Sequence, residues 1–205
     1  MTERLLIDGP AGRIEIALDT PAEAPRGAAV IAHPHPLFGG TLDNKVAQAL
    51  ARCFVELGYV SVRSNFRGVG ATEGEHDNGE GETDDIEHVA RWAMQRYETA
   101  APVLAGFSFG AYVQTRVAKR IAPERMALVG VPNGLVTAGR SYASEAVPAD
   151  TIVIHGELDD TVPLSNVLDW ARPQDLPIVL VPGADHFFHR RLHIIRSIIK
   201  GAWRI

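Results

Sequence analysis

Short runs of apolar residues recur along this chain, separated by longer stretches in which apolar residues repeat every three or four positions. Several runs are apolar at every position, which is typical of strands that are covered on both faces of a parallel sheet. The run at 59–62 alternates more and is the least typical of the set. We predict strands at residues 28–32, 59–62, 102–106, 126–130, 151–155 and 177–181, and an additional edge strand at 13–18.

The stretches between these runs have the period of amphipathic helices. In residues 43–57 the apolar positions fall on one face, Asp43 is a suitable N-cap, and Gly58 is a suitable stop. In residues 84–97 the pattern recurs, with Asp84 and Glu87 at the spacing of a capping box. Further helices are predicted at 109–120, 164–171 and 187–200.

The alternation of strands and helices predicts parallel βα units in one α/β fold, a doubly wound and mostly parallel sheet with helices on both faces. Residues 73–87 interrupt the pattern, because they are rich in Asp and Glu and hold no Lys or Arg. The ligand spacing of a calcium loop is absent there. We expect a solvated, mobile loop that leads into a helix N-terminus, where the helix dipole favours negative charge.

The composition narrows the class of protein. A chain of 205 residues has room for one sizeable core, so we expect a single domain over 1–205. A hydrophobic content of 46% and a charged content of 22% are ordinary for a soluble protein. The net charge of −5 gives no reason to expect nucleic acid as a partner. No apolar run approaches the length of a membrane span, and the start of the chain lacks the apolar segment of a signal peptide. The lone Cys53 excludes an internal disulfide, and we expect a cytoplasmic protein.

One predicted strand runs directly into a Gly-x-Ser-x-Gly turn, Gly106 to Gly110, with Ser108 at its centre. A strand that reverses sharply into a helix crowds the positions two before and two after the serine, and glycine removes the side chains that would clash there. The helix starts after Ser108, so the amide of Phe109 can stabilise an oxyanion. Either the turn is an ordinary one, or Ser108 is a nucleophile.

A serine nucleophile needs a base and an orienting carboxylate, and two later strands are followed by suitable residues. Asp159 and Asp160 follow the strand at 151–155, and His186 follows the strand at 177–181. All three positions come after the carboxyl ends of strands, where α/β sheets collect their sites, and their chain order fits this type of nucleophile. We predict Ser108, Asp159 and His186 as a catalytic triad. Asp159 is preferred over Asp160 because it lies nearer to the strand end.

A second oxyanion donor is expected in the loop after an early strand, here "HPHPLFGG" at 33–40. Prolines have no amide hydrogen, which leaves Leu37 and His35, in that order of preference. The histidines of this loop, His33 and His35, and also His186, His189 and His193, are the alternative candidates for metal ligands. We expect neither a metal nor a cofactor, because the last two share a helical stripe with basic residues.

Five motifs together resemble one known family: "HPHPLFGGTLDNK", "NFRGVGATEG", "GFSFG", "HGELDDTVP" and "GADHFF". They are similar to those of small α/β-hydrolases of the dienelactone hydrolase-like branch, and they occur in family order over most of residues 28 to 190. The resemblance implies an α/β-hydrolase fold, the same triad, and an oxyanion hole built from Phe109 and the HPHP loop. Dienelactone hydrolases proper carry cysteine as nucleophile, so their lactone substrate is not carried over.

The predicted reaction is hydrolysis of carboxylic esters through an acyl-enzyme at Ser108. Thioesters, amides or peptides are the alternative substrates, and a non-catalytic binding module on the same fold is a less favoured reading. The interval 131–150 has room for a short flap and not for a cap domain, so short acyl chains are expected in an open site. Leu135, Val136 and Tyr142 are candidate wall residues. The expected partner is a small acyl ester, and the sequence assigns no oligomeric state.

Overall fold

The computed structural model describes residues 2–203 and is built around one eight-stranded sheet, whose strand order is β1-β2-β4-β3-β5-β6-β9-β10. Pairing is antiparallel between β1 and β2 and between β2 and β4, and parallel in all other pairs. The strands are β1 (Thr2–Gly9), β2 (Gly12–Asp19), β3 (Gly27–Ala32), β4 (Tyr59–Ser64), β5 (Val103–Phe107), β6 (Arg125–Val129), β9 (Ile152–Gly156) and β10 (Ile178–Val181).

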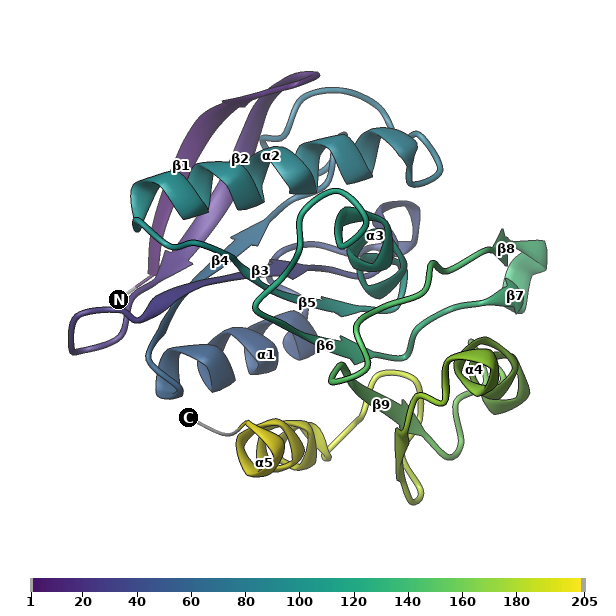
Figure 1. Cartoon of the computed structure of the whole chain (residues 1–205). Helices are drawn as coiled ribbons and strands as arrows, with labels where there is room; N and C mark the ends of the chain where they lie inside the picture. Colours follow the sequence, from purple (N-terminus) through teal and green to yellow (C-terminus); the bar gives the residue numbers. More distant parts are fainter. Residues whose placement is uncertain (1, 204–205) are drawn as a thin grey trace.

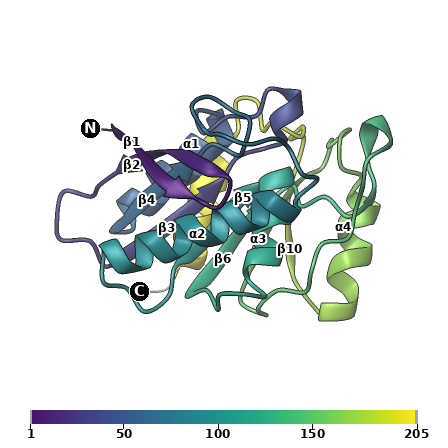
Figure 2. The same cartoon turned by 90° about the horizontal axis from the view of Figure 1, so that it is seen from above.

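The helices cover both faces of the sheet, as predicted, and Figure 1 shows the two layers. The helices are α1 (Lys45–Glu56), α2 (Glu80–Arg96), α3 (Phe109–Val117), α4 (Leu164–Ala171) and α5 (Leu192–Ala202). One apolar core lies between the sheet and α2, α3 and α4, and a second lies between the sheet and α1 and α5. Seen from above, α2 and α3 lie in front of the strands and α1 behind them (Figure 2). None of the helices in residues 2–203 combines the length and apolar character needed to cross a bilayer.

The N-terminal part differs from the expectation. The strand predicted at 13–18 is not an edge strand, because β2 pairs with β4 on one side and with β1 on the other. β1 was not predicted. Most of its side chains are exposed or half-buried, so its sequence shows little of the alternation that marks a buried strand.

Three helix starts also differ from the prediction. Asn44, and not Asp43, caps α1, since its side-chain oxygen accepts hydrogen bonds from two amides of the first turn at 2.9 and 3.3 Å. The N-cap of α2 is Gly79, whose amide donates to the Glu82 carboxylate at 2.8 Å, so the helix starts at Glu80 and the predicted capping box of Asp84 and Glu87 lies inside it. α5 starts only at Leu192, because 187–191 form turns that include residues with positive φ.

The acidic stretch 73–87 is only partly the solvated loop that was expected: residues 73–78 form a mostly exposed loop that leads into α2, but the first turns of that helix contain buried acids. Glu82 is fully buried and accepts hydrogen bonds from the amides of Asp77 and Gly79. Asp85 is also buried and forms a two-pronged ion pair with Arg67, with both N···O distances at 2.8 Å. A guanidinium and a carboxylate matched in this way satisfy each other, which makes burial of both tolerable.

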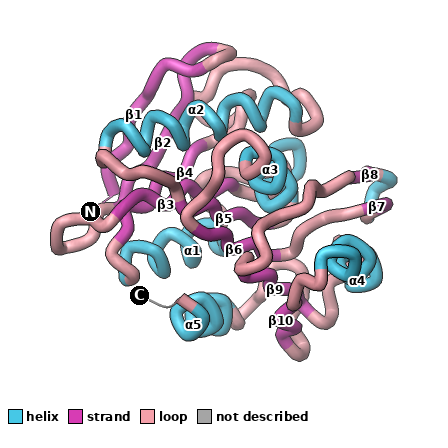
Figure 3. The backbone as a smooth tube through the Cα atoms, viewed as in Figure 1, coloured by secondary structure: helices cyan, strands magenta, loops and turns pink. Residues whose placement is uncertain are grey.

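The interval between β6 and β9 forms a small hairpin, β7 (Gly134–Leu135) paired with β8 (Ser141–Tyr142), with a 3-10 turn at Thr137–Gly139. Figure 3 shows this hairpin projecting on the same side of the molecule as α4. Its size fits the expected short flap. No separate cap of helices stands over the carboxyl ends of the strands in the described residues.

Candidate active site

Ser108 occupies a sharp turn between β5 and α3. Its backbone has φ 55° and ψ −123°, a strained combination for a residue with a side chain, and its amide donates to the carbonyl of Val129 at 2.9 Å. A Cβ on Gly106 would lie 2.5 Å from the carbonyl oxygen of Gly110, and one on Gly110 would lie 2.3 Å from that of Ala32. The steric reason expected for the two glycines therefore holds in the structure.

The structure brings the three predicted triad side chains together at the carboxyl edge of the sheet. His186 Nε2 lies 3.0 Å from Ser108 Oγ, and His186 Nδ1 lies 2.7 Å from Asp159 Oδ2. Ser108 is 7% exposed, and the side chains of the other two are buried. A carboxylate on one ring nitrogen and a hydroxyl on the other is the arrangement that lets an imidazole take the hydroxyl proton.

Of the neighbouring acids, only Asp159 is placed to orient the histidine. Its second oxygen, Oδ1, accepts hydrogen bonds from the amides of Thr161 and Val162 at 3.0 and 2.7 Å, which fixes the carboxylate. Asp160 is exposed, as expected from its place in the loop. Asp185 pairs with His189, whose ring Nδ1 lies 2.6 Å away, and so takes no part in the triad contacts.

A second buried histidine, His155, lies next to the Asp159 carboxylate, and the sequence analysis missed it. His155 lies at the end of β9, its Nε2 3.1 Å from the carbonyl oxygen of Val162 and 3.7 Å from Asp159 Oδ2. Burial lowers the pKa of His155, so the ring is neutral near pH 7 and donates through Nε2 to the carbonyl. His155 thus adds a dipole beside Asp159 without a competing charge.

The HPHP loop is held over the nucleophile by its first histidine. His33 is fully buried, its Nε2 accepts from the amide of Phe66 at 3.0 Å, and its Nδ1 lies 2.7 Å from the carbonyl oxygen of Pro34. Burial lowers the pKa of His33 to about 4, so the ring is neutral and donates from Nδ1. Gly40 then turns back on the loop, where a Cβ would meet the Pro34 carbonyl oxygen.

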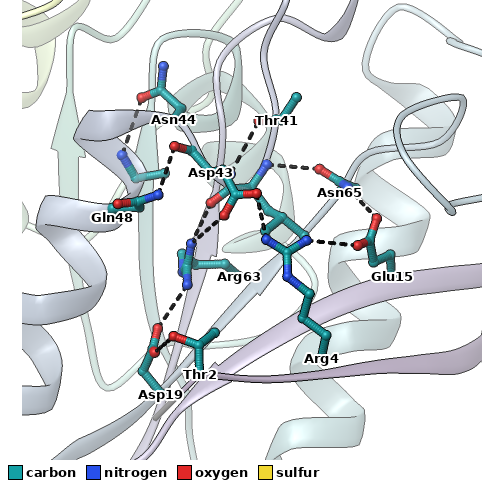
Figure 4. Close-up of polar contacts among 12 residues, drawn as sticks. Thr2, Arg4, Glu15, Asp19, Thr41, Asp43, Asn44, Gln48, Arg63 and Asn65 are labelled. Carbon is teal, nitrogen blue, oxygen red and sulfur yellow. Dashed lines mark hydrogen bonds and ion pairs between the residues drawn. The ribbon is translucent and has the colours of Figure 1, made fainter.

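A polar network anchors the far end of the same loop (Figure 4). The amide of Leu42 donates to Asn65 Oδ1 at 2.8 Å, and the carbonyl of Leu42 accepts from Arg63 at 2.7 Å. Arg63 is buried and also pairs with Asp19 at 2.9 Å. The loop is therefore tied at both ends to β4 and to the residues that directly follow it.

The geometry of the HPHP loop distinguishes the two candidate amides for the second oxyanion donor, those of Leu37 and His35. The amide of Leu37 already donates to the ring Nδ1 of His35 at 3.3 Å, and the Leu37 side chain points outward, 69% exposed. Leu37 does not line the hollow at Ser108 either, so the geometry favours His35 over Leu37 as the second donor. The amide of His35 forms no hydrogen bond within residues 2–203, and its residue borders the hollow at Ser108. The ring of His35 packs on that of Phe109, 4.8 Å between centroids.

A small hollow of about 110 Å³ lies in front of Ser108 and His186. Its walls are formed by side chains that the sequence analysis did not select: Phe38, Asn44, Arg140, Thr161 and Phe187. The predicted wall residues are not among those that line it.

The positions of those three residues explain why they do not line the hollow. Val136 is buried in the core beneath the hairpin, and the Leu135 side chain is largely exposed. Tyr142 packs its ring on Tyr112, 5.1 Å between centroids. The pairing of the hairpin turns the neighbouring Arg140 toward the hollow instead.

A larger cavity of about 630 Å³ adjoins this hollow. The two share Gly39, Asn44 and Phe187, and the larger one continues past Lys45 and Arg190. It offers room beyond the nucleophile for a second part of a substrate.

The histidines weighed as metal ligands do not gather into a site. Both ring nitrogens of His33 are engaged, and His189 is paired with Asp185. In the part of the chain that the structure describes, no three His, Cys, Asp or Glu side chains are grouped in a way that would hold a metal ion.

Known proteins resemble this chain along nearly its whole length. An α/β serine hydrolase without a lid from Xanthomonas campestris superposes with a TM-score of 0.87 at 35% identity, covering 98% of this chain and 93% of that one. An α/β serine hydrolase homologue from Coxiella burnetii gives a TM-score of 0.85 at 38% identity, covering 97% and 96%. An uncharacterized protein of Rickettsia prowazekii (strain Madrid E) is 32% identical over 197 residues, which are 90% of this chain and 82% of that protein.

The model of a protein family described as X-Pro dipeptidyl-peptidase (S15 family) matches residues 8–134. The structural matches confirm the expected resemblance to small α/β-hydrolases, while the dienelactone hydrolase-like label stays a prediction. This chain therefore belongs to the S15 family as a serine hydrolase with the α/β-hydrolase fold.

Proposed function

We propose that this chain hydrolyses carboxylic esters with short acyl groups through an acyl-enzyme on Ser108. The observation that carries the proposal is the continuous chain of contacts from Asp159 through His186 to Ser108, at 2.7 and 3.0 Å. Such a chain converts a weakly nucleophilic hydroxyl into one that can attack an acyl carbon.

In the first half of the reaction, His186 Nε2 takes the Ser108 proton as Oγ bonds to the acyl carbon. Asp159 holds the imidazole and stabilises the imidazolium that forms. The oxygen of the tetrahedral intermediate accepts hydrogen bonds from the amides of Phe109 and His35. When the intermediate collapses, the C–O bond to the alcohol breaks and His186 gives its proton to the departing oxygen.

In the second half, water attacks the acyl-enzyme with His186 again as base, and the acid leaves with Ser108 restored. The small hollow of about 110 Å³ suits a short acyl group. The adjoining cavity of about 630 Å³ suits the alcohol portion. We therefore propose the small hollow as the acyl site and the larger cavity as the site of the alcohol portion.

The family match favours a second candidate, cleavage of peptides after an X-Pro unit. Such a substrate presents an N-terminal ammonium group, for which a carboxylate is the natural partner. Among the described residues, the side chains that line the hollow at Ser108 include Arg140 and no Asp or Glu. That charge repels an ammonium group, so we place ester hydrolysis first.

The test is a panel of 4-nitrophenyl esters of increasing chain length, a thioester, and Ala-Pro-4-nitroanilide, with wild type and Ser108→Ala compared. We expect the short esters to be preferred. Ser108→Ala should lower their kcat by at least roughly 10³, because the triad acts as a unit. A fluorophosphonate probe should label wild type at Ser108 alone. Equal ester turnover by the two proteins, or labelling elsewhere only, would refute the assignment, and preference for the anilide would establish the peptidase.

A further inference from the structure

Among residues 2–203, one side chain with a permanent charge lines the hollow in front of Ser108. That side chain is Arg140, on the turn that joins β7 to β8. The other wall residues are apolar residues, uncharged polar residues and the histidines His35 and His186. Burial lowers the pKa of His35 to about 4, with smaller contributions from His76 and from Arg140 itself, so His35 is uncharged near pH 7.

The guanidinium of Arg140 is held in place entirely by neutral groups. Its centre lies 4.4 Å from the centroid of the Phe38 ring, a distance at which a cation is attracted to the aromatic face. Its Nε and Nη2 donate to the carbonyl of Thr137 at 3.3 and 3.2 Å, and its Nη1 donates to the hydroxyl of Tyr142 at 3.3 Å. These contacts fix the position of the charge without neutralising it.

No carboxylate within residues 2–203 forms an ion pair with Arg140. The contacts described use three of the five N–H donors that a guanidinium offers, which leaves one on each terminal nitrogen. Two donors on adjacent terminal nitrogens suit the two oxygens of one carboxylate. The site thus has a fixed cation, half-buried, with its remaining donors open beside the nucleophile.

We propose that Arg140 is a specificity-determining residue that binds a carboxylate on the substrate, so that the preferred esters are anionic. The inference rests on the proposed ester hydrolysis and names the class of ester. A carboxylate a few carbon atoms from the scissile bond would lie against Arg140 while the acyl carbon lies at Ser108. A neutral ester leaves the guanidinium without a counter-charge in a partly desolvated site, which disfavours its binding.

The competing explanation is that Arg140 only braces the hairpin, because its contact with the Thr137 carbonyl closes that turn. A brace would affect every substrate alike, whereas a carboxylate-binding residue changes the ratio between anionic and neutral substrates. The ratio of kcat/KM values for a matched pair therefore separates the two explanations.

The experiment compares monoethyl glutarate with ethyl 5-oxohexanoate, in which a methyl ketone replaces the carboxylate, by pH-stat titration. We expect wild type to prefer the anion. Arg140→Gln should lower the ratio of kcat/KM for the anionic ester to kcat/KM for the neutral ester by roughly 10- to 100-fold, which is the effect of losing a hydrogen-bonded charge contact. Arg140→Lys should give a ratio between those of wild type and Arg140→Gln. The control is Arg96→Gln, which removes another arginine that lies over an aromatic ring, at the end of α2. It should leave the ratio unchanged. A second pair, 4-acetoxybutyrate and butyl acetate, has the carboxylate on the alcohol portion of the ester instead of on the acyl portion. Comparison of the two pairs shows on which portion of the substrate Arg140 favours a carboxylate.

Two results would overturn the proposal: a wild type with no preference for the anion in either pair, or an Arg140→Gln variant that loses activity on both members equally. Turnover of 4-nitrophenyl acetate is measured in parallel. If that ester and both pairs remain uncleaved, the proposed function itself has failed. If 4-nitrophenyl acetate is cleaved without a charge preference, only the role of Arg140 has failed. Glutarate should also slow fluorophosphonate labelling of Ser108 in wild type and not in Arg140→Gln, and this readout needs no turnover.

Discussion

Replacement of Asp159 by asparagine isolates one hydrogen bond of the site. In the present structure Oδ1 of Asp159 accepts from two backbone amides, those of Thr161 and Val162, and Oδ2 faces His186 Nδ1. An asparagine at 159 must keep its oxygen toward the two amides, because its NH₂ group would otherwise face two donors. The NH₂ group then faces His186 Nδ1. The ring must accept there, and its single proton moves to Nε2.

An imidazole with its proton on Nε2 cannot accept the proton of Ser108, so the base is lost although the geometry is kept. The corresponding change in a Ser-His-Asp triad lowers kcat by about 10⁴, which equals about 5 kcal/mol of transition-state stabilisation. We expect a loss of that order for Asp159→Asn. The matched control is Asp160→Asn. Asp160 is exposed and its carboxylate makes only a long contact of 3.4 Å to Thr161, so a change of less than about twofold is expected.

The assay is the initial rate of 4-nitrophenyl acetate hydrolysis at neutral pH, with thermal unfolding of each variant recorded to show that it is folded. Asn is isosteric with Asp, so both variants should unfold cooperatively near the wild-type midpoint. The reasoning is refuted if Asp159→Asn, while folded, keeps more than about a tenth of the wild-type kcat. It is equally refuted if Asp160→Asn is the more damaged variant.

Three further predictions concern stability. Gly110→Ala should unfold at a clearly lower temperature in calorimetry, because the new Cβ would lie 2.3 and 2.5 Å from backbone oxygens. The control is Gly201→Ala in α5, where a new Cβ would have nothing within 4 Å, and this variant should be neutral or slightly stabilised. Similar unfolding midpoints for the two variants would contradict the packing argument. Asp85→Asn should lower the free energy of unfolding in urea by about 3 kcal/mol, because it leaves Arg67 charged and poorly paired in a half-buried position. A loss below about 1 kcal/mol would show that the ion pair is not needed. Burial holds the pKa of His33 at about 4 in the folded chain, below its ordinary value, so only the unfolded chain takes up this proton between about pH 6.5 and 4. The free energy of unfolding should fall as the pH drops through that window, and His33→Gln should flatten the fall; an unchanged slope would argue against a buried neutral ring.

The parts of the molecule that follow from local chemistry were predictable. The central strands are buried on both faces, so their sequences are apolar at almost every position and predict strands, with His155 in β9 as an exception. A side chain on Gly106 would meet the backbone of Gly110 within the same turn, so this glycine follows from the turn alone, whereas a side chain on Gly110 would meet the carbonyl oxygens of Ala32 and His33 at the end of β3. The triad was predictable because its members follow the ends of parallel strands, which meet at one edge of a sheet.

The features that were missed depend on contacts between distant segments. Asp85, in α2, can be buried because Arg67 from the loop after β4 forms an ion pair with it. The charge pattern of 73–87 does not predict this partner. The strand β1 exists because it pairs with β2, and its own side chains are mostly at the surface. Arg140 faces the hollow only because the hairpin folds back, which a stretch of 20 residues without strong periodicity does not predict.

The site combines residues on buried, rigid elements with one residue, Arg140, on a projecting hairpin. The predicted triad and the proposed oxyanion donors lie at the ends of buried strands, in the strained turn and on a loop anchored at both ends. The charge that we propose to select substrates sits on a hairpin that projects from the sheet (Figure 3). Sequence changes and insertions are tolerated best in such projecting segments. Descendants of this architecture can therefore acquire new substrates by altering one short hairpin, while the machinery that breaks the bond is inherited intact.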